Sequence, residues 1–260
     1  MAKKDTVDRA RQDNVVGARA RYIRSFRVLD SANPAGYPFS LPIVRYLAGL
    51  DDGLPIPAGV TFFVGENGSG KSTLIEAIAV AAGMNAEGGS QNYRFTTRAT
   101  ESALSDHLAM SWEPAKPRSK FFLRAESYYN VATESERIGP AQIAELGGVS
   151  PHEQSHGESF ISLMIHRFRR RGLYLLDEPE AALSPRGCMT ALVRLADLAD
   201  QECQIIVATH SPILLALPGA TIYEVSDDGS IRNVAFDEAM PVRLTKRFLA
   251  NPDGLLRHLV

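Results

Sequence analysis

Apolar and polar positions in the first half of the chain follow the periods of strands and helices. Residues 21–29 (RYIRSFRVL) alternate polar and apolar side chains, which predicts a half-buried strand, and IVRYL at 43–47 predicts a second strand. The apolar run GVTFFV (59–64) predicts a buried strand. A glycine-rich stretch follows it, and residues 72–82 then have a helical pattern that Gly83 ends.

The second half of the chain continues this succession of strands and helices. Its predicted elements are strands at 121–126, 173–179 and 204–209, helices at 159–171 and 185–200, and a hairpin around the turn at 227–229. We expect Gly172 to end the first of these helices. Strands that alternate with helices indicate an α/β fold with a mainly parallel sheet and right-handed connections.

Composition and charge exclude some classes of protein. The chain has 260 residues, of which 45% are hydrophobic, so it can bury a large core. Its formal net charge of -2 does not mark the whole chain as nucleic-acid-binding. Residues 1–27, however, carry eight Lys or Arg against three Asp. Such an arm is either a solvated, poorly ordered terminus or a weak anchor for phosphate backbone or another acidic partner.

Cysteine usage and the apolar stretches indicate the compartment. Cys188 and Cys203 have no metal-type spacing, and no secretory leader precedes them, which is typical of a reduced, cytoplasmic protein. Stretches such as 211–223 contain Pro or are shorter than the roughly 20 residues that span a bilayer. We therefore expect no transmembrane segment, so that a role at a membrane would require another chain.

The stretch GENGSGKS (65–72) has the G-x-x-x-x-G-K-S spacing of a phosphate-binding loop between a strand and a helix. Glycines let the backbone N–H groups and the helix N-terminus approach phosphates closely. Lys71 is expected to bridge the β- and γ-phosphates of ATP, and Ser72 to hold Mg²⁺. The candidate nucleotide-binding residues are Gly65, Glu66, Asn67, Gly68, Ser69, Gly70, Lys71, Ser72 and Thr73.

Two acids and a histidine follow the buried strands of the second half. Asp177 and Glu178 end the run LYLLDEP, at the edge of the sheet where ligands collect in doubly wound folds. Asp177 can position Mg²⁺ through water, and Glu178 can accept a proton from the attacking water. His210 follows the next strand, from where it can reach a γ-phosphate or orient the water.

These features, in this order, resemble the ATP-binding cassette (ABC-type) ATPases. The signature of that family, L-S-G-G-Q, precedes the acidic strand, and this sequence has QSHGE there. Ser155 and Gly157 match the two positions that touch nucleotide. Gln154, His156 and Glu158 replace the leading Leu, the first Gly and the final Gln.

The resemblance implies roles for these residues. Ser155 and Gly157 would bind the γ-phosphate held by the phosphate loop of a second subunit, so an ATP-dependent homodimer is expected. Glu178 would be the catalytic base and His210 the switch histidine, with Lys71 as the third catalytic residue. Residues 181–184 match the D-loop of the family, with Ser184 where Asp is usual.

The resemblance covers residues 21–236 and implies the architecture. We expect a P-loop NTPase of ABC type with a mainly parallel core sheet, an N-terminal antiparallel β subdomain and a small helical signature subdomain. The basic arm would occupy residues 1–20, and a single ATPase domain residues 21–260, with a helical insert at about 127–160.

Three assignments stay open from the sequence. The glutamine of the family's Q-loop could be Gln91, or an acid, Glu126, could replace it. The aromatic residue that stacks on adenine could be Tyr37 or Phe39, or both could be packed loop residues. The arginines at 167 and 169–171 end the helix predicted at 159–171, either as cations favourable at its C-terminus or as a nucleic-acid contact.

Three functions remain compatible with the sequence. The first is a cytoplasmic Mg²⁺-dependent ATPase that dimerises around ATP and drives or gates a partner protein or nucleic acid, with DNA repair, chromosome maintenance and defence as candidate processes. The motifs SHGES, DEPEAALSP and ATHSPILLALPGA look most like compact stand-alone bacterial ATPases of this superfamily. The second is the nucleotide-binding subunit of a membrane transporter. The third is an ATP-dependent binding switch with little turnover.

Overall fold

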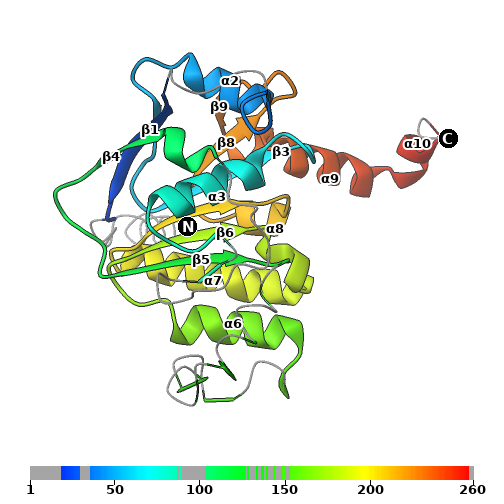
Figure 1. Ribbon diagram of the computed structural model, residues 1–260. Helices are drawn as coiled ribbons and strands as arrows, with labels where there is room; N and C mark the ends of the chain where they lie inside the picture. The colour runs from blue at the N-terminus through cyan, green and yellow to red at the C-terminus, as the bar shows by residue number, and fades with distance from the viewer. Residues whose placement is uncertain are drawn as a thin grey trace, which may run out of the picture.

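The structure of the chain is a computed structural model (Figure 1), which describes residues 19–29, 36–86, 88–89, 103–126, 128, 133, 136–137, 139, 143–144, 148–149 and 153–257. The strands are β1 (Ile23–Val28), β2 (Leu54–Pro55), β3 (Val60–Gly65), β4 (Leu108–Trp112), β5 (Ser119–Arg124), β6 (Gly172–Asp177), β7 (Gln204–Ala208), β8 (Thr221–Val225) and β9 (Ile231–Val234). The helices are α2 (Pro42–Ala48), α3 (Lys71–Ala81), α6 (His156–His166), α7 (Pro185–Asp200), α8 (Pro212–Leu215), α9 (Met240–Ala250) and α10 (Pro252–Leu256), with 3-10 turns η1 (Ser105–His107), η3 (Pro179–Ala182) and η4 (Phe236–Glu238).

The described residues form two sheets. The core sheet has the strand order β5-β6-β7-β3-β8-β9, in which every pair is parallel except β8 with β9. The second sheet, β2-β1-β4, is antiparallel. Both the mainly parallel α/β sheet and the antiparallel N-terminal sheet predicted from the sequence are therefore confirmed.

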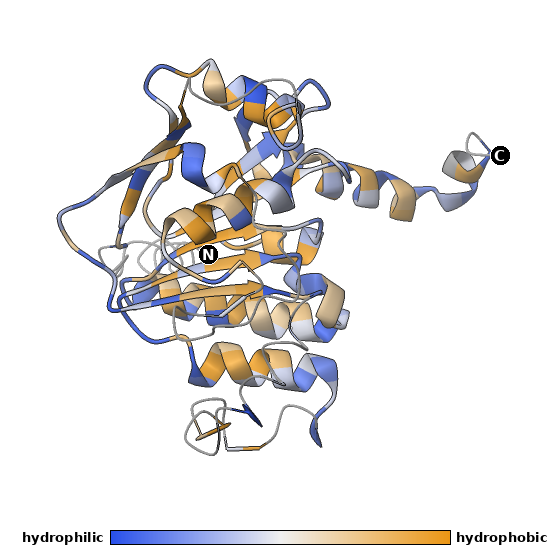
Figure 2. Ribbon diagram, viewed as in Figure 1, coloured by the Kyte–Doolittle hydropathy of each residue, from blue (hydrophilic) through white to orange (hydrophobic). Residues whose placement is uncertain are grey.

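Two hydrophobic cores cover the two faces of the core sheet. Successive residues of a strand point to opposite faces, so Phe62 of β3 packs toward α6 and α7, whereas Phe63 packs toward α3 and the antiparallel sheet. Figure 1 shows α3 on one side of the sheet and α7, then α6, on the other. The central parallel strands are mostly hydrophobic in Figure 2, as expected for strands buried on both faces of a sheet.

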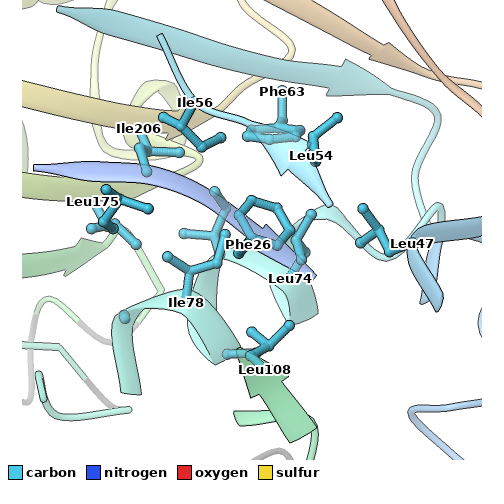
Figure 3. Close-up of a cluster of buried hydrophobic side chains, with 14 of the residues drawn as sticks. Phe26, Leu47, Leu54, Ile56, Phe63, Leu74, Ile78, Leu108, Leu175 and Ile206 are labelled. Carbon is cyan, nitrogen blue, oxygen red and sulfur yellow. The ribbon is translucent and has the colours of Figure 1, made fainter. Parts of the chain in front are cut away.

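The core under α3 joins the two sheets. Figure 3 shows Phe26 of β1 beside Leu74 and Ile78 of α3, with Leu175 and Ile206 of the core sheet in the same cluster. All of these side chains are almost fully buried. The helix that starts at the phosphate loop is thus held between two sheets, which fixes the position of its first turn.

A buried amide also ties the antiparallel sheet to the core sheet. The side-chain oxygen of Gln204 accepts hydrogen bonds of 2.8 Å from the backbone N–H groups of Tyr22 and Ile23, and its nitrogen donates to the oxygen of Ile23 at 2.9 Å. The side chain thus completes the backbone hydrogen bonds at the start of β1.

Two predictions of secondary structure were wrong. Residues 43–47 are not a strand but lie in the helix α2, because Ile43, Val44 and Leu47 bury one helical face and Pro42 stands at its first position. The helix predicted at 159–171 runs instead from His156 to His166, and Gly172 belongs to β6.

Several predictions concern residues outside the described ranges. Most of the basic arm (1–20), the candidate Gln91, and much of the helical insert at 127–160 belong to them. The division into an arm and a single ATPase domain over 21–260 stays a prediction. Among the described helices, none is long and apolar enough to cross a membrane.

Of the arginines predicted to end a helix, Arg167 is the C-cap of α6, whereas those at 169–171 lie in the loop between α6 and β6. The Arg171 side chain donates to Glu202 at 2.7 Å, and Arg170 pairs with the same acid at 3.3 Å. Arg167 lies over the ring of Phe121. At least three of the four cations therefore have contacts within the chain, at the edge of the sheet where β6 begins.

Candidate functional site

The phosphate loop connects β3 to α3, as the sequence predicts. Gly68 and Gly70 have φ values of 81° and 90°, a left-handed conformation that non-glycine residues rarely adopt. A Cβ atom at Gly70 would lie 2.7 Å from the side chain of Ile43, so α2 packs directly against the loop. A Cβ at Gly68 would meet nothing within 4 Å, so the backbone there is open to a ligand.

Lys71 is the first residue of α3 and is folded over the loop. Its ammonium group donates to the backbone oxygens of Gly65 and Glu66 at 3.0 and 2.8 Å, and to the hydroxyl of Ser69 at 3.2 Å. Burial lowers the pKa of Lys71, although the nearby carboxylates of Glu178 and Asp177 oppose the shift. The loop therefore holds one cation at the N-terminus of a helix, where an anion binds favourably.

The carboxyl ends of the parallel strands bring the predicted acids to the same edge. Asp177 ends β6 and is almost fully buried, and burial raises the pKa of this carboxyl while the guanidinium of Arg124 opposes the rise. Oδ2 of Asp177 accepts a hydrogen bond of 3.0 Å from Arg124. Oδ1 is buried and has no well-aligned hydrogen-bond donor among the described residues, but the Ser72 hydroxyl lies close enough to the carboxyl to oppose the rise in its pKa.

Glu178 follows in a left-handed conformation, with φ 47° and ψ 52°. Its N–H donates to the oxygen of Ala208 at 3.0 Å, which anchors the turn to β7. Helical conformations are unfavourable for a residue that precedes a proline, and Glu178 precedes Pro179. This backbone strain is a feature that often accompanies functional sites.

His210 follows β7, one strand along from the acids. Its Nε2 lies 3.7 Å from Oε1 of Glu178, and its backbone N–H donates to Glu180. Burial, followed by the positive charge of Lys71, lowers the pKa of His210 below the usual imidazole value. The ring is therefore expected to be neutral at pH 7.

A cavity of about 270 Å³ joins these elements at the carboxyl edge of the sheet. The residues that line it are Tyr37, Ser72, Thr73, Glu76, Arg124, Glu126, Asp177 and Glu178. It thus brings together the two predicted magnesium ligands, Ser72 and Asp177, with the predicted base. The Ser72 hydroxyl and the Asp177 carboxylate interact with each other, and these neighbouring oxygens suit Mg²⁺, which prefers oxygen ligands.

The structure separates the two candidate aromatic residues. Tyr37 lines the cavity, is 71% exposed, and shares a hydrogen bond of 3.0 Å with the hydroxyl of Thr73. Phe39 is buried and packs edge to face on His107, with ring centroids 5.0 Å apart. Of these two rings, only that of Tyr37 is therefore exposed for stacking on a ligand. Of the Q-loop candidates, Glu126 lines the same cavity, and Gln91 lies outside the described residues.

The signature residues begin α6, on the other side of the sheet from α3. Ser155 is the N-cap of α6: its hydroxyl oxygen accepts from the N–H of Glu158, and the Glu158 carboxylate accepts from the N–H and hydroxyl of Ser155. This is a capping box, which stabilises a helix start. Glu158, which replaces the family's glutamine, thus supports the exposed N-terminus of the helix.

Ser155 and Gly157 line a second cavity, of about 660 Å³, between α6, the turn η3 and the start of α7. Ser184, at the position of the D-loop acid, also lines it and caps α7 by accepting from the N–H of Gly187 at 3.1 Å. None of the residues that line this cavity lines the cavity beside the phosphate loop. The structure therefore does not bring the two sets of predicted nucleotide ligands together within one chain.

Sequence reasoning missed three charged residues at the site. Arg124 bridges Asp177 and Glu76, and Glu180 accepts from the backbone of His210. Arg124 lies in a predicted strand, but its role depends on the pairing of β5 with β6, which the sequence pattern does not give. Glu76 and Glu180 lie inside a helix and a turn, where no sequence pattern distinguishes them from surface acids.

Comparisons with known proteins match the two halves of the site separately. A family model described as "AAA domain" matches residues 51–131, which include the phosphate loop. A second, described as "AAA domain, putative AbiEii toxin, Type IV TA system", matches residues 142–216, which include the signature, the acids and His210. No curated protein matches the chain significantly.

Solved structures with a similar fold have low sequence identity. The SMC head domain from Thermotoga maritima is 15% identical over 82% of this chain and 97% of that chain, with a TM-score of 0.41. A putative metal-chelate type ABC transporter is 17% identical over 82% and 84% of the two chains, with a TM-score of 0.46. The SMC head bound to the C-terminal winged-helix domain of ScpA is 15% identical over 70% and 91%, with a TM-score of 0.44.

The class of the protein follows from the motifs, the sheet topology and the two AAA-domain matches. The phosphate loop between β3 and α3, the acids at the end of β6 and the helix that begins at Ser155 occur in the order of the cassette ATPases. The chain thus matches AAA-domain models over two of its parts, and in the order of its motifs it is similar to P-loop ATPases of the ABC type.

Proposed function

We propose that two copies of this chain bind ATP and Mg²⁺ between them and hydrolyse ATP to ADP and phosphate at two composite sites. The observation that supports this most strongly is the separation of the half-sites. Lys71, Asp177 and Glu178 gather at the carboxyl edge of the sheet, while Ser155 and Gly157 line a different cavity at an exposed helix start. A second copy can bring its own signature helix to the γ-phosphate of the first.

The residues of the phosphate-loop half have distinct roles in this proposal. Lys71 leaves its contacts with the loop and binds the β- and γ-phosphates. Glu178 accepts a proton from the attacking water, and the neutral ring of His210, 3.7 Å from Glu178, orients that water. Ser72 and Asp177 would hold Mg²⁺, which when bound neutralises negative charge on the phosphate oxygens.

The signature half of the second copy completes the site. Ser155 and Gly157 contribute the N-terminus of α6, whose N–H groups and dipole favour the γ-phosphate. Tyr37 contributes the face of an exposed ring for the adenine. Such a dimer closes with ATP and opens after hydrolysis, and in this way drives or gates a partner protein or nucleic acid.

A mixing experiment tests whether the sites are composite. Lys71→Ala disables the phosphate loop, and Ser155→Asp disables the signature while keeping a good N-cap residue. Each variant alone is expected to be inactive. A one-to-one mixture forms mixed dimers with one intact site each, so about a quarter of wild-type ATPase activity is expected to return.

The matched control mixes Lys71→Ala with Glu178→Gln, whose defects lie on the same half of the composite site. A mixed dimer of this pair has no intact site, so no activity is expected. Recovery in the control, or none in the first mixture, contradicts the composite site. If wild-type protein does not hydrolyse ATP in the presence of Mg²⁺, the proposed activity itself is contradicted.

A further inference from the structure

The end of β5 carries a cation that connects three elements of the site. Arg124 donates from Nε to Oδ2 of Asp177 at 3.0 Å and from a terminal nitrogen to Oε2 of Glu76 at 2.8 Å. Its side chain is 18% exposed, and those of Asp177 and Glu76 are 5% and 13% exposed. This bridge is therefore largely shielded from solvent, where hydrogen-bonded ion pairs hold a defined geometry better than surface pairs do.

The sheet places this arginine where it contacts the acid. Arg124 and Asp177 are partners in the parallel register of β5 and β6, so their side chains extend from neighbouring positions at the carboxyl end of the sheet. Glu76 comes from α3, the helix that carries Lys71 and Ser72 in its first turn. The guanidinium thus fixes the acid of β6 relative to the helix that carries the other magnesium ligand.

The hydrogen bond leaves one particular oxygen of Asp177 for a ligand. Arg124 holds Oδ2, whereas Oδ1 is buried without a well-aligned donor among the described residues. The Ser72 hydroxyl, the other predicted magnesium ligand, interacts with the same carboxyl and partly offsets the rise that burial causes in its pKa. Asp177, Ser72 and Arg124 all line the same cavity. A carboxylate with one oxygen anchored cannot turn freely, so its second oxygen keeps one direction without a cost in side-chain entropy when a ligand binds.

We propose that Arg124 is a positioning residue for magnesium, which with Glu76 as its second anchor holds Asp177 so that Oδ1 stays available to the cation shared with Ser72. The inference rests on the proposed function, because it assumes that Mg²⁺ accompanies the nucleotide. In this inference the Arg124 guanidinium, at the end of β5, orients the Asp177 carboxylate and does not bind the cation itself. A guanidinium at this place could instead act as a cation that competes with Mg²⁺ for Asp177, and that reading predicts an effect of opposite sign.

The test is the thermodynamic coupling between Mg²⁺ and nucleotide. The probe is a fluorescent, non-hydrolysable ATP analogue, whose Kd is measured in EDTA and at saturating Mg²⁺. The ratio of the two Kd values reports how much Mg²⁺ strengthens binding. Because loss of a supporting contact commonly weakens a metal site by 10–100-fold, Arg124→Gln is expected to shrink this ratio by about tenfold or more.

Other variants separate positioning from charge. Arg124→Lys keeps the charge but not the two-point bridge, so it is expected to restore only part of the ratio. Glu76→Gln keeps Arg124 and weakens its anchor, so a smaller loss is expected. Lys120→Gln is the matched control, because Lys120 lies on the same strand, donates to Ala82 at 2.8 Å, and does not line the cavity. Its ratio is expected to equal that of wild type.

Each outcome decides the proposal. The Kd in EDTA is expected to stay near the wild-type value in all four variants, since phosphate binding by the loop does not use Arg124. An unchanged ratio in Arg124→Gln would show a merely structural role, and a larger ratio would show a competing cation; both overturn the inference. If Arg124→Gln does not fold, the same criteria apply to Arg124→Lys and Glu76→Gln. Failure of wild-type protein to bind the analogue contradicts the proposed function, and the inference with it.

Discussion

Nε2 of His210 lies 3.7 Å from Oε1 of Glu178, although the two residues follow different strands. The contact arises because β6 and β7 are parallel neighbours whose last residues, Asp177 and Ala208, are partners in the register. Glu178 and His210 follow these two strand ends. The strand order therefore places the Glu178 carboxylate, which lines the cavity together with Ser72, beside the imidazole of His210. This is the geometry on which the catalytic predictions depend.

Replacement of Glu178 by Gln is expected to lower kcat for ATP hydrolysis by at least about 100-fold, since general-base catalysis contributes that much or more. The Kd for ATP is expected to change little, because Gln keeps the size of the side chain. Steady-state phosphate release and nucleotide binding measure the two quantities. Glu202→Gln is the control, because Glu202 pairs with Arg171 at the opposite end of β6 from Glu178. A fully active Glu178→Gln protein would rule out this residue as the base.

The charge of Lys71 affects the titration of His210. Burial is the main cause that lowers the pKa of His210, and the Lys71 ammonium is the next. Lys71→Met removes that charge while it keeps an apolar stem, so the pKa of His210 is expected to rise. In wild-type protein the ring stays neutral to a lower pH than usual, and in the variant it binds its proton at a higher pH.

An NMR titration of the ring protons of His210 measures this shift, with His210→Asn to assign the signal. Arg186→Met is the control, since Arg186 is not among the charges that affect His210. An unchanged or lower pKa in Lys71→Met would contradict the electrostatic contact between the two side chains.

The sequence predicted those parts of the site whose chemistry lies in contiguous residues. The loop from Gly65 to Ser72 and the acids at the end of β6 are each a short motif with a fixed local conformation. Both motifs lie between the elements at which they were predicted. Arg124 was missed because its role depends on strand order: it meets Glu76, 48 residues away, only once α3 packs on the core sheet and β5 pairs with β6. Periodicity alone does not give that order.

The wrong prediction for α2 has a different cause. IVRYL is short and begins with two β-branched residues, so propensity favours a strand. The helix forms because Ile43, Val44 and Leu47 are buried together against the phosphate loop and α3. Tertiary packing therefore overrides a weak local preference, and Pro42 at the first helical position was the one local signal of it.

The buried amide of Gln204 predicts a large loss of stability on substitution. Gln204→Leu leaves the N–H groups of Tyr22 and Ile23 buried without partners, since the amide oxygen accepts from both. An unsatisfied buried group costs about 1–3 kcal/mol, so a loss of about 2–5 kcal/mol in the free energy of unfolding is expected. Urea denaturation measures it. Gln201→Leu, at the end of α7, is the control; an equal effect of the two substitutions would contradict the role of the amide.

The left-handed backbone of Glu178 predicts that glutamate is not the most stable residue at this position. A non-glycine residue in this conformation costs about 1–2 kcal/mol, whereas glycine adopts it freely. Glycine also gives the unfolded chain more freedom, which offsets part of the gain. Comparison of Glu178→Gly with Glu178→Ala isolates the backbone, because both variants lose the carboxylate and its repulsion of Asp177. Glu178→Gly is expected to unfold with a free energy about 1 kcal/mol higher than Glu178→Ala.

The same pair of substitutions at Glu180 provides the control. Glu180 lies in η3 with a right-handed backbone, so glycine there is expected to be less stable than alanine. Opposite signs at positions 178 and 180 would identify strain at Glu178 as the cause. Equal signs would mean that the turn relaxes at no cost, and the conformation at Glu178 would then contribute nothing to the position of its carboxylate. With opposite signs, part of the stability of the fold is given up to direct that carboxylate toward His210 and the cavity.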